Sequence, residues 1–269
     1  MFAKFNLELN KDNLAFNKIF DIWGLGQYEK HKQEIHHALD KYLIDDGYLD
    51  ASKIEEDWFP SVNTQVFLSH SHQDEEDVIR LAGFLFENYG ITSFIDSTIW
   101  GYANNLLKQI DDKYCVKKGK KSDGFTYDYD KRNQSTAHVH MILQGALAKM
   151  INRCEALVFV NTPSSLKPAD LGDDKTTASP WIYSELLMAN TFPARPPEYY
   201  GILKDKRHDD FLEHFDLKVN YRVGLTDFVD INLDDIQKSA SKTTKKTARA
   251  VLDQIYLDKG LMVNAAITG

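Results

Sequence analysis

Cysteine is scarce in this sequence. Cys115 and Cys154 are its two cysteines, and neither lies in a Cys-x-x-Cys motif. Two thiols in 269 residues allow one disulfide bond at most, so a disulfide framework cannot hold the chain together. We expect both cysteines to be free. Hydrophobic residues make up 43% of the chain, which is enough to fill a core.

Long apolar runs are also absent. No stretch approaches the ~20 consecutive apolar residues that a membrane-spanning helix needs, and the N-terminus lacks the apolar centre of a signal peptide. The sequence therefore predicts a soluble, cytoplasmic protein without a membrane partner.

Positive charge is in deficit. Lys and Arg number 32 against 40 Asp and Glu, which gives a formal net charge of −8 and an isoelectric point near 5.6. Nucleic-acid-binding surfaces need clustered basic residues to contact phosphates, so this balance argues against a nucleic-acid partner. The one basic run, residues 242–246, is expected to be the solvated start of a helix.

One stretch, residues 64–111, has a strand-helix-strand pattern. Residues 65–68 are rich in strand-forming side chains, and residues 75–88 carry apolar side chains at helical spacings of three and four. Gly90 stands where a helix usually ends, and a second strand over residues 91–95 stops before an aspartate. This βαβ unit predicts a parallel sheet covered by helices.

The polar residues after these two strands mark the expected binding site, because ligands of open parallel sheets bind beyond the carboxyl ends of the strands. Those ends are residues 69–71 and 96–100. Asp74 is expected to cap the following helix rather than to touch substrate. Residues 156–160 form a continuous apolar run typical of a third, central strand.

The remainder of the chain is expected to surround this core. Residues 1–60 are interpreted as a helical N-terminal extension, and residues 61–269 as the α/β domain with an insertion near 113–135. Further elements are expected as helices at 27–44, 51–58, 141–150, 181–188 and 248–255 and as strands at 221–223 and 228–231. The predicted fold class is α/β, a flavodoxin-like parallel sheet with helices on both faces.

Several of these motifs resemble those of the Toll/interleukin-1 receptor (TIR) domain family, especially its bacterial, NAD-cleaving branch. The strand ending VFLSH at 66–70, the strand ending in Asp96 and the W-x-x-x-E motif of Trp181 and Glu185 occur in the family's order. The resemblance covers residues 65–190, about half of the chain. It departs from the family's pattern at residues 103–104, where Ala and Asn replace a glycine and an acidic residue.

The resemblance implies an enzyme that cleaves the nicotinamide–ribose bond of NAD, with Glu185 as the catalytic residue, NAD as the substrate, and no cofactor or metal. Loss of nicotinamide builds positive charge on the ribose, and a neighbouring carboxylate stabilises that charge. The products would be nicotinamide and linear or cyclic ADP-ribose. The resemblance also implies self-association through TIR–TIR contacts and a role in immune, anti-phage signalling, with a downstream effector that senses the product.

Six further residues are expected to contact the substrate. They are Ser69, His70, Ser71, Asp96, Trp100 and Trp181. Backbone N–H groups and the helix dipole favour phosphate or ribose oxygens near residues 69–71, although turn and capping chemistry explains the two serines equally well. Trp100 is expected to be covered, either by the protein core or by a flat ligand. Trp181 fits core packing as well as a ligand platform.

A metal site is not expected. His70 and His72 are two residues apart and lack a third ligand nearby. A second group on an expected helix offers weak ligand geometry because of its spacing; it consists of His31, His36 and His37.

The residues leave other functions open. Many TIR domains are non-catalytic scaffolds that act by homotypic protein–protein interaction, and these need no acid at Glu185, which by itself would be an exposed helix residue. A nucleoside deoxyribosyltransferase would also place a glutamate beside a ribose. A phosphoreceiver domain is set aside, because it needs an acidic pair after its first strand and an aspartate after its third, where this chain has Ser69-His70 and Asn161.

Overall fold

The computed structural model describes residues 1–9, 18–31, 39–43, 48–59, 62–117, 126–168, 175–195 and 221–262. The chain forms two compact units. An α/β unit comprises Met1–His31, Asn63–Asp96 and Ile151–Gly269, and a helical unit comprises Lys32–Val62 and Ser97–Met150. The division does not follow the expected boundary at residue 60, because both ends of the chain belong to the α/β unit.

A five-stranded parallel sheet forms the centre of the α/β unit. Its strands are β1 (Ala3–Glu8), β2 (Val66–Ser69), β3 (Ser93–Ile95), β4 (Ala156–Asn161) and β8 (Val229–Ile231). They lie in the order β3-β2-β4-β1-β8, and every neighbouring pair is parallel. The strands predicted before Ser69, Asp96 and Thr162 are thus confirmed as three neighbours in one sheet.

The N-terminal residues form a strand instead of part of a helical extension. Ala3, Phe5 and Leu7 are buried on one face of the sheet, and this alternation is the period of a strand. β1 lies between β4 and β8, with Ala3 opposite Ala156. The prediction of a helical extension is therefore wrong at residues 3–8, which complete the sheet.

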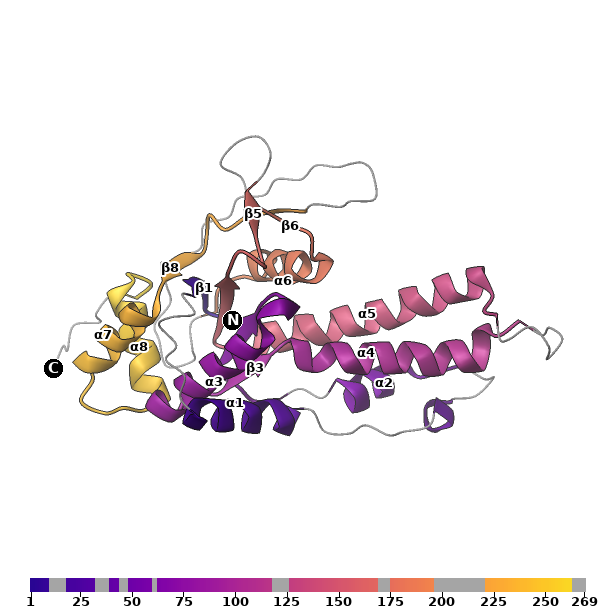
Figure 1. Ribbon diagram of the computed structural model, residues 1–269, viewed down its shortest axis with the longest axis horizontal. Helices are drawn as coiled ribbons and strands as arrows, with labels where there is room; N and C mark the ends of the chain where they lie inside the picture. The colour runs from indigo at the N-terminus through magenta and orange to yellow at the C-terminus, as the bar shows by residue number, and fades with distance from the viewer. Residues whose placement is uncertain are drawn as a thin grey trace. The chain divides into compact units, whose positions relative to one another are not determined.

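Helices cover both faces of this sheet. They are α1 (Lys18–His31), α3 (Glu75–Tyr89), α6 (Pro180–Thr191), α7 (Leu233–Lys242) and α8 (Ala248–Asp258). α3, α7 and α8 pack on the face that carries Phe5 and Leu68. α6 lies on the opposite face, where Lys4 of β1 donates to Asn190 at 3.1 Å (Figure 1). The predicted α/β fold with helices on both faces is confirmed.

The ends of these helices follow local sequence signals. Gly90 ends α3 in the left-handed conformation at φ 69°, as predicted. Pro180 occupies the first turn of α6, and the Ser179 side chain caps that helix by accepting from the backbone N–H of Ile182. The basic run 242–246 lies between α7 and α8, not at the start of a helix as expected.

α1 begins and ends earlier than the predicted helix over 27–44. Gln27 lies inside α1, where its side chain donates to the backbone oxygen of Ala82 (3.1 Å) and accepts from the backbone N–H of Ser93 (2.8 Å). The later part of the predicted helix is a short turn, η2 (Leu39–Tyr42), in the helical unit. Residues 32–38 lie outside the described residues.

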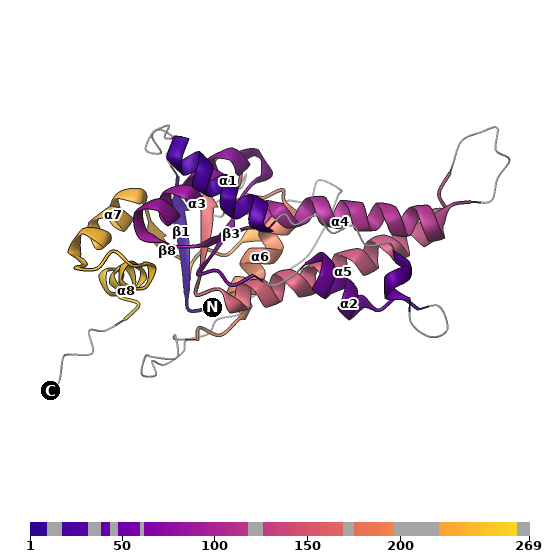
Figure 2. The same ribbon diagram turned by 90° about the horizontal axis from the view of Figure 1, so that it is seen from below.

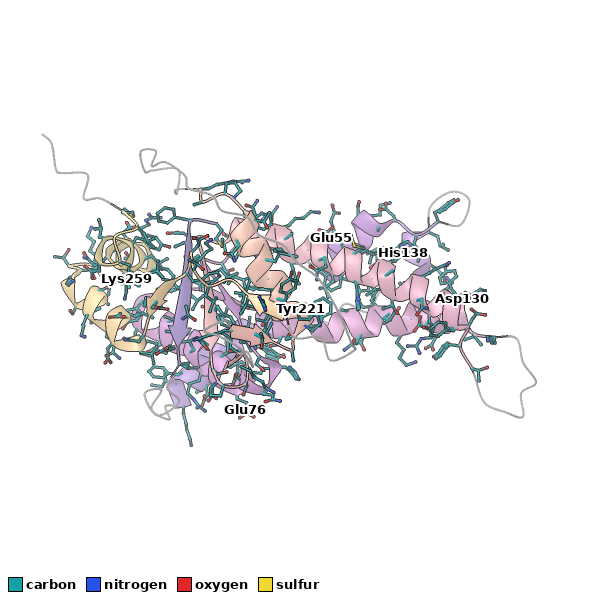
Figure 3. The ribbon with its side chains drawn as sticks, turned by 90° about the horizontal axis from the view of Figure 1, so that it is seen from above. Glu55, Glu76, Asp130, His138, Tyr221 and Lys259 are labelled. Carbon is teal, nitrogen blue, oxygen red and sulfur yellow. The ribbon has the colours of Figure 1, made fainter. Side chains whose placement is uncertain are left out.

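A second sheet is small and antiparallel. It contains β5 (Lys167–Pro168), β6 (Lys175–Thr177) and β7 (Tyr221–Val223), in that order. β7 is the predicted late strand over 221–223, whereas the other late strand is β8 of the main sheet. Tyr221, labelled in Figure 3, stacks on Tyr183 of α6 with ring centroids 4.6 Å apart. The small sheet therefore packs against the helix that carries Glu185.

The helical unit is built on two long helices. Its elements are η2, α2 (Ala51–Trp58, as predicted), α4 (Ser97–Ile110), the π-helical turn η5 (Asp111–Cys115) and α5 (Tyr129–Arg153). Figures 1 and 2 show α4 and α5 side by side. Lys149 of α5 forms an ion pair of 2.6 Å with Glu55 of α2, which Figure 3 labels.

Residues 97–104 are helical, so the prediction of a loop there is wrong. Ile99, Ala103, Leu106 and Ile110 recur at spacings of four and three, which is a helix period that the single Gly101 does not interrupt. Ala103, Leu106 and Ile110 are buried. The buried residues Ala103, Leu106 and Ile110 thus lie on one face of α4.

The expected insertion near 113–135 is also partly helical. Its first residues belong to η5 and its last to α5, whereas residues 118–125 lie outside the described residues. Asp111, buried at the π-helical turn, accepts a hydrogen bond from Arg132 at 2.9 Å and another from Ser135. Cys115 beside it is buried and free, as is Cys154, which confirms the prediction for both thiols.

α1 and α3 approach closely, and Figures 1 and 2 show them side by side. A Cβ at Gly24 would lie 1.9 Å from the backbone oxygen of Ile79, and a Cβ at Gly83 would lie 1.8 Å from that of Phe20. Gly26, two residues along α1, has nothing within 4 Å of such a Cβ.

These contacts predict opposite effects of two alanine substitutions. Gly24→Ala forces α1 away from α3 and should lower the free energy of unfolding by at least ~1–3 kcal/mol, the usual cost of overpacking. Gly26→Ala should leave it unchanged or raise it by up to ~1 kcal/mol, because alanine favours the helix. Urea unfolding of both variants measures the difference. Equal effects would contradict the close approach.

Candidate functional site

Glu185 meets the end of β2. Ser69 is the last residue of β2, and its Oγ donates a hydrogen bond of 2.6 Å to Oε2 of Glu185, on the second turn of α6. Both side chains are completely buried. The pairing follows from the strand period: Ser69 alternates with Leu68, so its hydroxyl faces α6 while Leu68 enters the core under α3.

Asp96 and His70 form a second contact at the same end of the sheet. Asp96 directly follows β3, and His70 directly follows β2, which are neighbouring strands. His70 Nδ1 lies 2.5 Å from Oδ1 of Asp96 and 3.3 Å from the backbone oxygen of Leu68. The exposed fractions are 4% for His70 and 2% for Asp96. Nε2 of His70 is buried without a hydrogen-bond partner in the described part of the chain.

The two pairs are joined through their carboxyl groups. Burial raises the pKa of Glu185 well above its usual value, and the neighbouring charge of Asp96 raises it further, while the hydrogen bond from Ser69 lowers it by a smaller amount. Glu185 is therefore the carboxyl group of this pair that holds a proton.

The pKa of His70 is also raised. Burial lowers it, but the charge of Asp96, the hydrogen bond with Asp96 and the backbone oxygen of Leu68 together outweigh burial. The negative charge of Asp96 thus favours the charged form of His70 and the neutral form of Glu185 in this buried site.

Glu185 is not the exposed helix acid that the sequence by itself suggested. Glu185 lies on the buried face of α6 together with Ile182, Leu186 and Ala189, which recur at helical spacings of three and four. The exposed face of this helix carries Leu187 and Asn190 instead. The position of Trp181, one turn earlier, agrees with a shared helix face, and its side chain is half-buried.

The other expected site residues lie apart from this cluster or outside the described side chains. Ser71 caps the short turn η4 (His72–Asp74), where its Oγ accepts from the backbone N–H of Gln73 at 3.4 Å. Trp100 belongs to α4, and its side chain is outside the described residues. Of the substrate-binding residues expected from the sequence, the structure thus brings Ser69, His70 and Asp96 to Glu185.

Asp74 does not cap α3 through its side chain, contrary to expectation. It stands at the N-cap position, but its carboxylate accepts a hydrogen bond of 2.5 Å from Oγ1 of Thr162, directly after β4. Both residues are buried. Sequence reasoning missed Thr162 as a partner; its only signal was a hydroxyl directly after a buried strand.

The two histidines of the β2 loop are not arranged around a common ion. His72 is exposed and pairs with Glu75 at 3.2 Å, whereas His70 is buried against Asp96. Within the described residues, no group of three His, Cys, Asp or Glu side chains has the arrangement of a metal site.

Comparison with protein-family models, with curated proteins and with solved structures finds no match to this chain. Among the described helices, none has the length and apolar character required to cross a bilayer.

The raised pKa of Glu185 predicts how stability changes with pH. Because the folded-state pKa lies above the unfolded value near 4.5, the protonated carboxyl group contributes its full stability below that pH. The contribution is lost as the pH rises towards the folded-state pKa, with a slope of at most ~1.4 kcal/mol per pH unit.

Glu185→Gln keeps the shape of the side chain and removes its ionisable carboxyl group. The unfolding free energy of this variant, relative to that of the unmodified protein, should therefore rise between pH 5 and pH 8, as measured by urea unfolding. Glu76→Gln, at an exposed position of α3 labelled in Figure 3, is the matched control and should show no such trend. A flat difference for Glu185→Gln would contradict the assigned protonation.

Proposed function

We propose that this protein is a TIR-type NAD glycohydrolase or ADP-ribosyl cyclase that cleaves the nicotinamide–ribose bond of NAD. The observation that carries the proposal is the meeting of Glu185 of α6 with Ser69 and Asp96 at the carboxyl ends of β2 and β3. The three residues come from separate elements and were expected at one site. Ligands of doubly wound sheets bind at such strand ends.

The strand order supports part of a flavodoxin-like assignment. β3, β2 and β4 lie in the order 2-1-3 that the first three strands of that fold adopt. The next position is held by the N-terminal β1, where a flavodoxin-like sheet has the strand that follows its third. We assign the TIR relationship to the segment from β2 to α6; β1 completes the sheet as the neighbour of β4, and β8 pairs with β1 at the edge.

The proposed chemistry depends on an ionised Glu185. When the bond between the ribose carbon and the ring nitrogen breaks, the bonding electrons stay on nicotinamide, which leaves neutral because its ring began cationic. The ribose carbon becomes positively charged and is stabilised by the carboxylate of Glu185. Water then adds to that carbon and gives linear ADP-ribose, or the adenine of the same molecule adds and gives a cyclic product.

Burial of Glu185 has two consequences for this proposal. A site closed to water strengthens the attraction between a carboxylate and a cationic ribose. The same closure means that substrate has to displace the groups that now cover Glu185. In the cell, we place the protein in the cytoplasm, without a metal or cofactor, where its product would signal to a separate effector in anti-phage immunity.

A non-catalytic TIR scaffold is the second candidate. The observation that favours it is the complete burial of Glu185, whose Oε2 accepts a hydrogen bond from Ser69 inside the protein. In a scaffold, this cluster would only fix α6 against the sheet, and homotypic contacts would carry the function.

Incubation of the purified protein with NAD separates the two candidates. We expect release of nicotinamide, detected by chromatography, and a loss of at least ~100-fold in rate with Glu185→Gln, since removal of a single group that stabilises transition-state charge has this effect. Glu76→Gln should retain the full rate. Absence of nicotinamide release by the unmodified protein would leave the scaffold as the remaining candidate, whereas release at an equal rate by a folded Glu185→Gln variant would exclude Glu185 as the catalytic residue.

Self-association is the second part of the proposal. By the resemblance, TIR sites are completed when the segment after the second strand, here residues 97–104, meets a neighbouring subunit; in this chain that segment begins α4. Specific activity should therefore rise with protein concentration, in parallel with the oligomer population measured by analytical ultracentrifugation. Constant specific activity from a strict monomer would refute this part.

A further inference from the structure

We propose that His70 and Asp96 are positioning residues that set the charge of Glu185, with Asp96 opposing its ionisation and His70 offsetting that opposition. The effect of these residues on catalysis rests on the proposed function, whereas the arrangement of the three side chains does not depend on that function.

The geometry forms one chain of contacts across the ends of two strands and a helix. Ser69 Oγ lies 2.6 Å from Glu185 Oε2, and His70 Nδ1 lies 2.5 Å from Asp96 Oδ1. Because Ser69 and His70 are consecutive residues, these two contacts bring the carboxyl groups of Glu185 and Asp96 to the same end of the sheet, where the charge of Asp96 acts on Glu185. His70 therefore acts on Glu185 through Asp96.

The polar and charged side chains around these contacts lie on a few elements. β2 and its loop contribute Ser69 and His70, the residue after β3 contributes Asp96, and α6 contributes Glu185. From α3, the charge of Glu75 also acts on His70, and it favours the protonated ring. No Lys or Arg side chain acts on Glu185 among the described residues, so His70 is the cation on which the carboxyl pair depends.

The proton balance gives the direction of each effect. Catalysis requires that Glu185 release its proton to solvent, which leaves two carboxylates and one imidazolium in a buried site. If His70 loses its charge, the same ionisation leaves two uncompensated negative charges and becomes harder. If Asp96 loses its charge, Glu185 ionises beside no other carboxylate and does so more easily. A purely structural role of either residue would not give opposite directions.

The test compares His70→Gln with Asp96→Asn. Activity should rise with pH as Glu185 ionises, so the acidic limb of the pH–rate profile should move up by about 1 pH unit or more in His70→Gln and down by a similar amount in Asp96→Asn. His72→Gln, an exposed histidine of the same loop, is the matched control and should leave the limb in place. Circular dichroism establishes folding, and His70→Gln alone is decisive if Asp96→Asn does not fold.

A second measurement does not need catalysis. Glutamate labelled with ¹³C at the carboxyl carbon gives a titration of Glu185 by NMR, identified by the signal that disappears in Glu185→Gln. The titration should shift in the same two directions as the pH–rate profile. If the titrations shift in these directions but the protein does not cleave NAD, the roles of His70 and Asp96 are supported and the proposed function is refuted. If the protein cleaves NAD but the titrations do not shift, or shift the same way in both variants, the proposed roles of His70 and Asp96 are refuted.

Discussion

The site depends on one constraint: two buried carboxyl groups, those of Glu185 and Asp96, lie at the same end of the sheet, and the charge of Asp96 acts on Glu185. Two carboxylates that are both removed from water repel each other and lose their hydration, so one of them has to keep a proton unless cations compensate. Ser69 supports Glu185 by a hydrogen bond, and His70 supports the charge of Asp96. Both interactions are effective only at hydrogen-bond distance, so two strand ends and one helix have to keep their positions.

The parallel sheet supplies that precision. Side chains of β2 alternate between the two faces, so Ser69 turns towards α6 while Leu68 enters the core beneath α3. α6 is held against the sheet at its other end by Lys4 and Asn190 and is packed by the small sheet through Tyr183 and Tyr221. The carboxylate of Glu185 is thereby fixed from three directions before any ligand arrives.

The chain passes from the α/β unit to the helical unit directly after a site residue. Asp96 is the last residue of its segment of the α/β unit, and α4 begins at the next residue. The chain returns to the sheet from the end of α5 into the first residue of β4, at the amino edge of the sheet. The loop after β4, at the carboxyl edge, carries Thr162, which donates a hydrogen bond to Asp74.

The sequence by itself determined the βαβ unit, the strand at residues 156–160 and the start of α6, because strand and helix periods and capping signals are local. Ser69, His70 and Asp96 were expected at the site because they follow predicted strands, whereas Glu185 was expected there only from the family resemblance. The sequence did not determine that residues 3–8 complete the sheet or that residues 97–104 are helical, because short segments with mixed signals take their structure from their partners. The pairing of His70 with Asp96 and the burial of Glu185 were decided only by the tertiary structure. These contacts span 26 and 116 residues of chain, and no local pattern encodes which side chains the folded sheet brings within 3 Å.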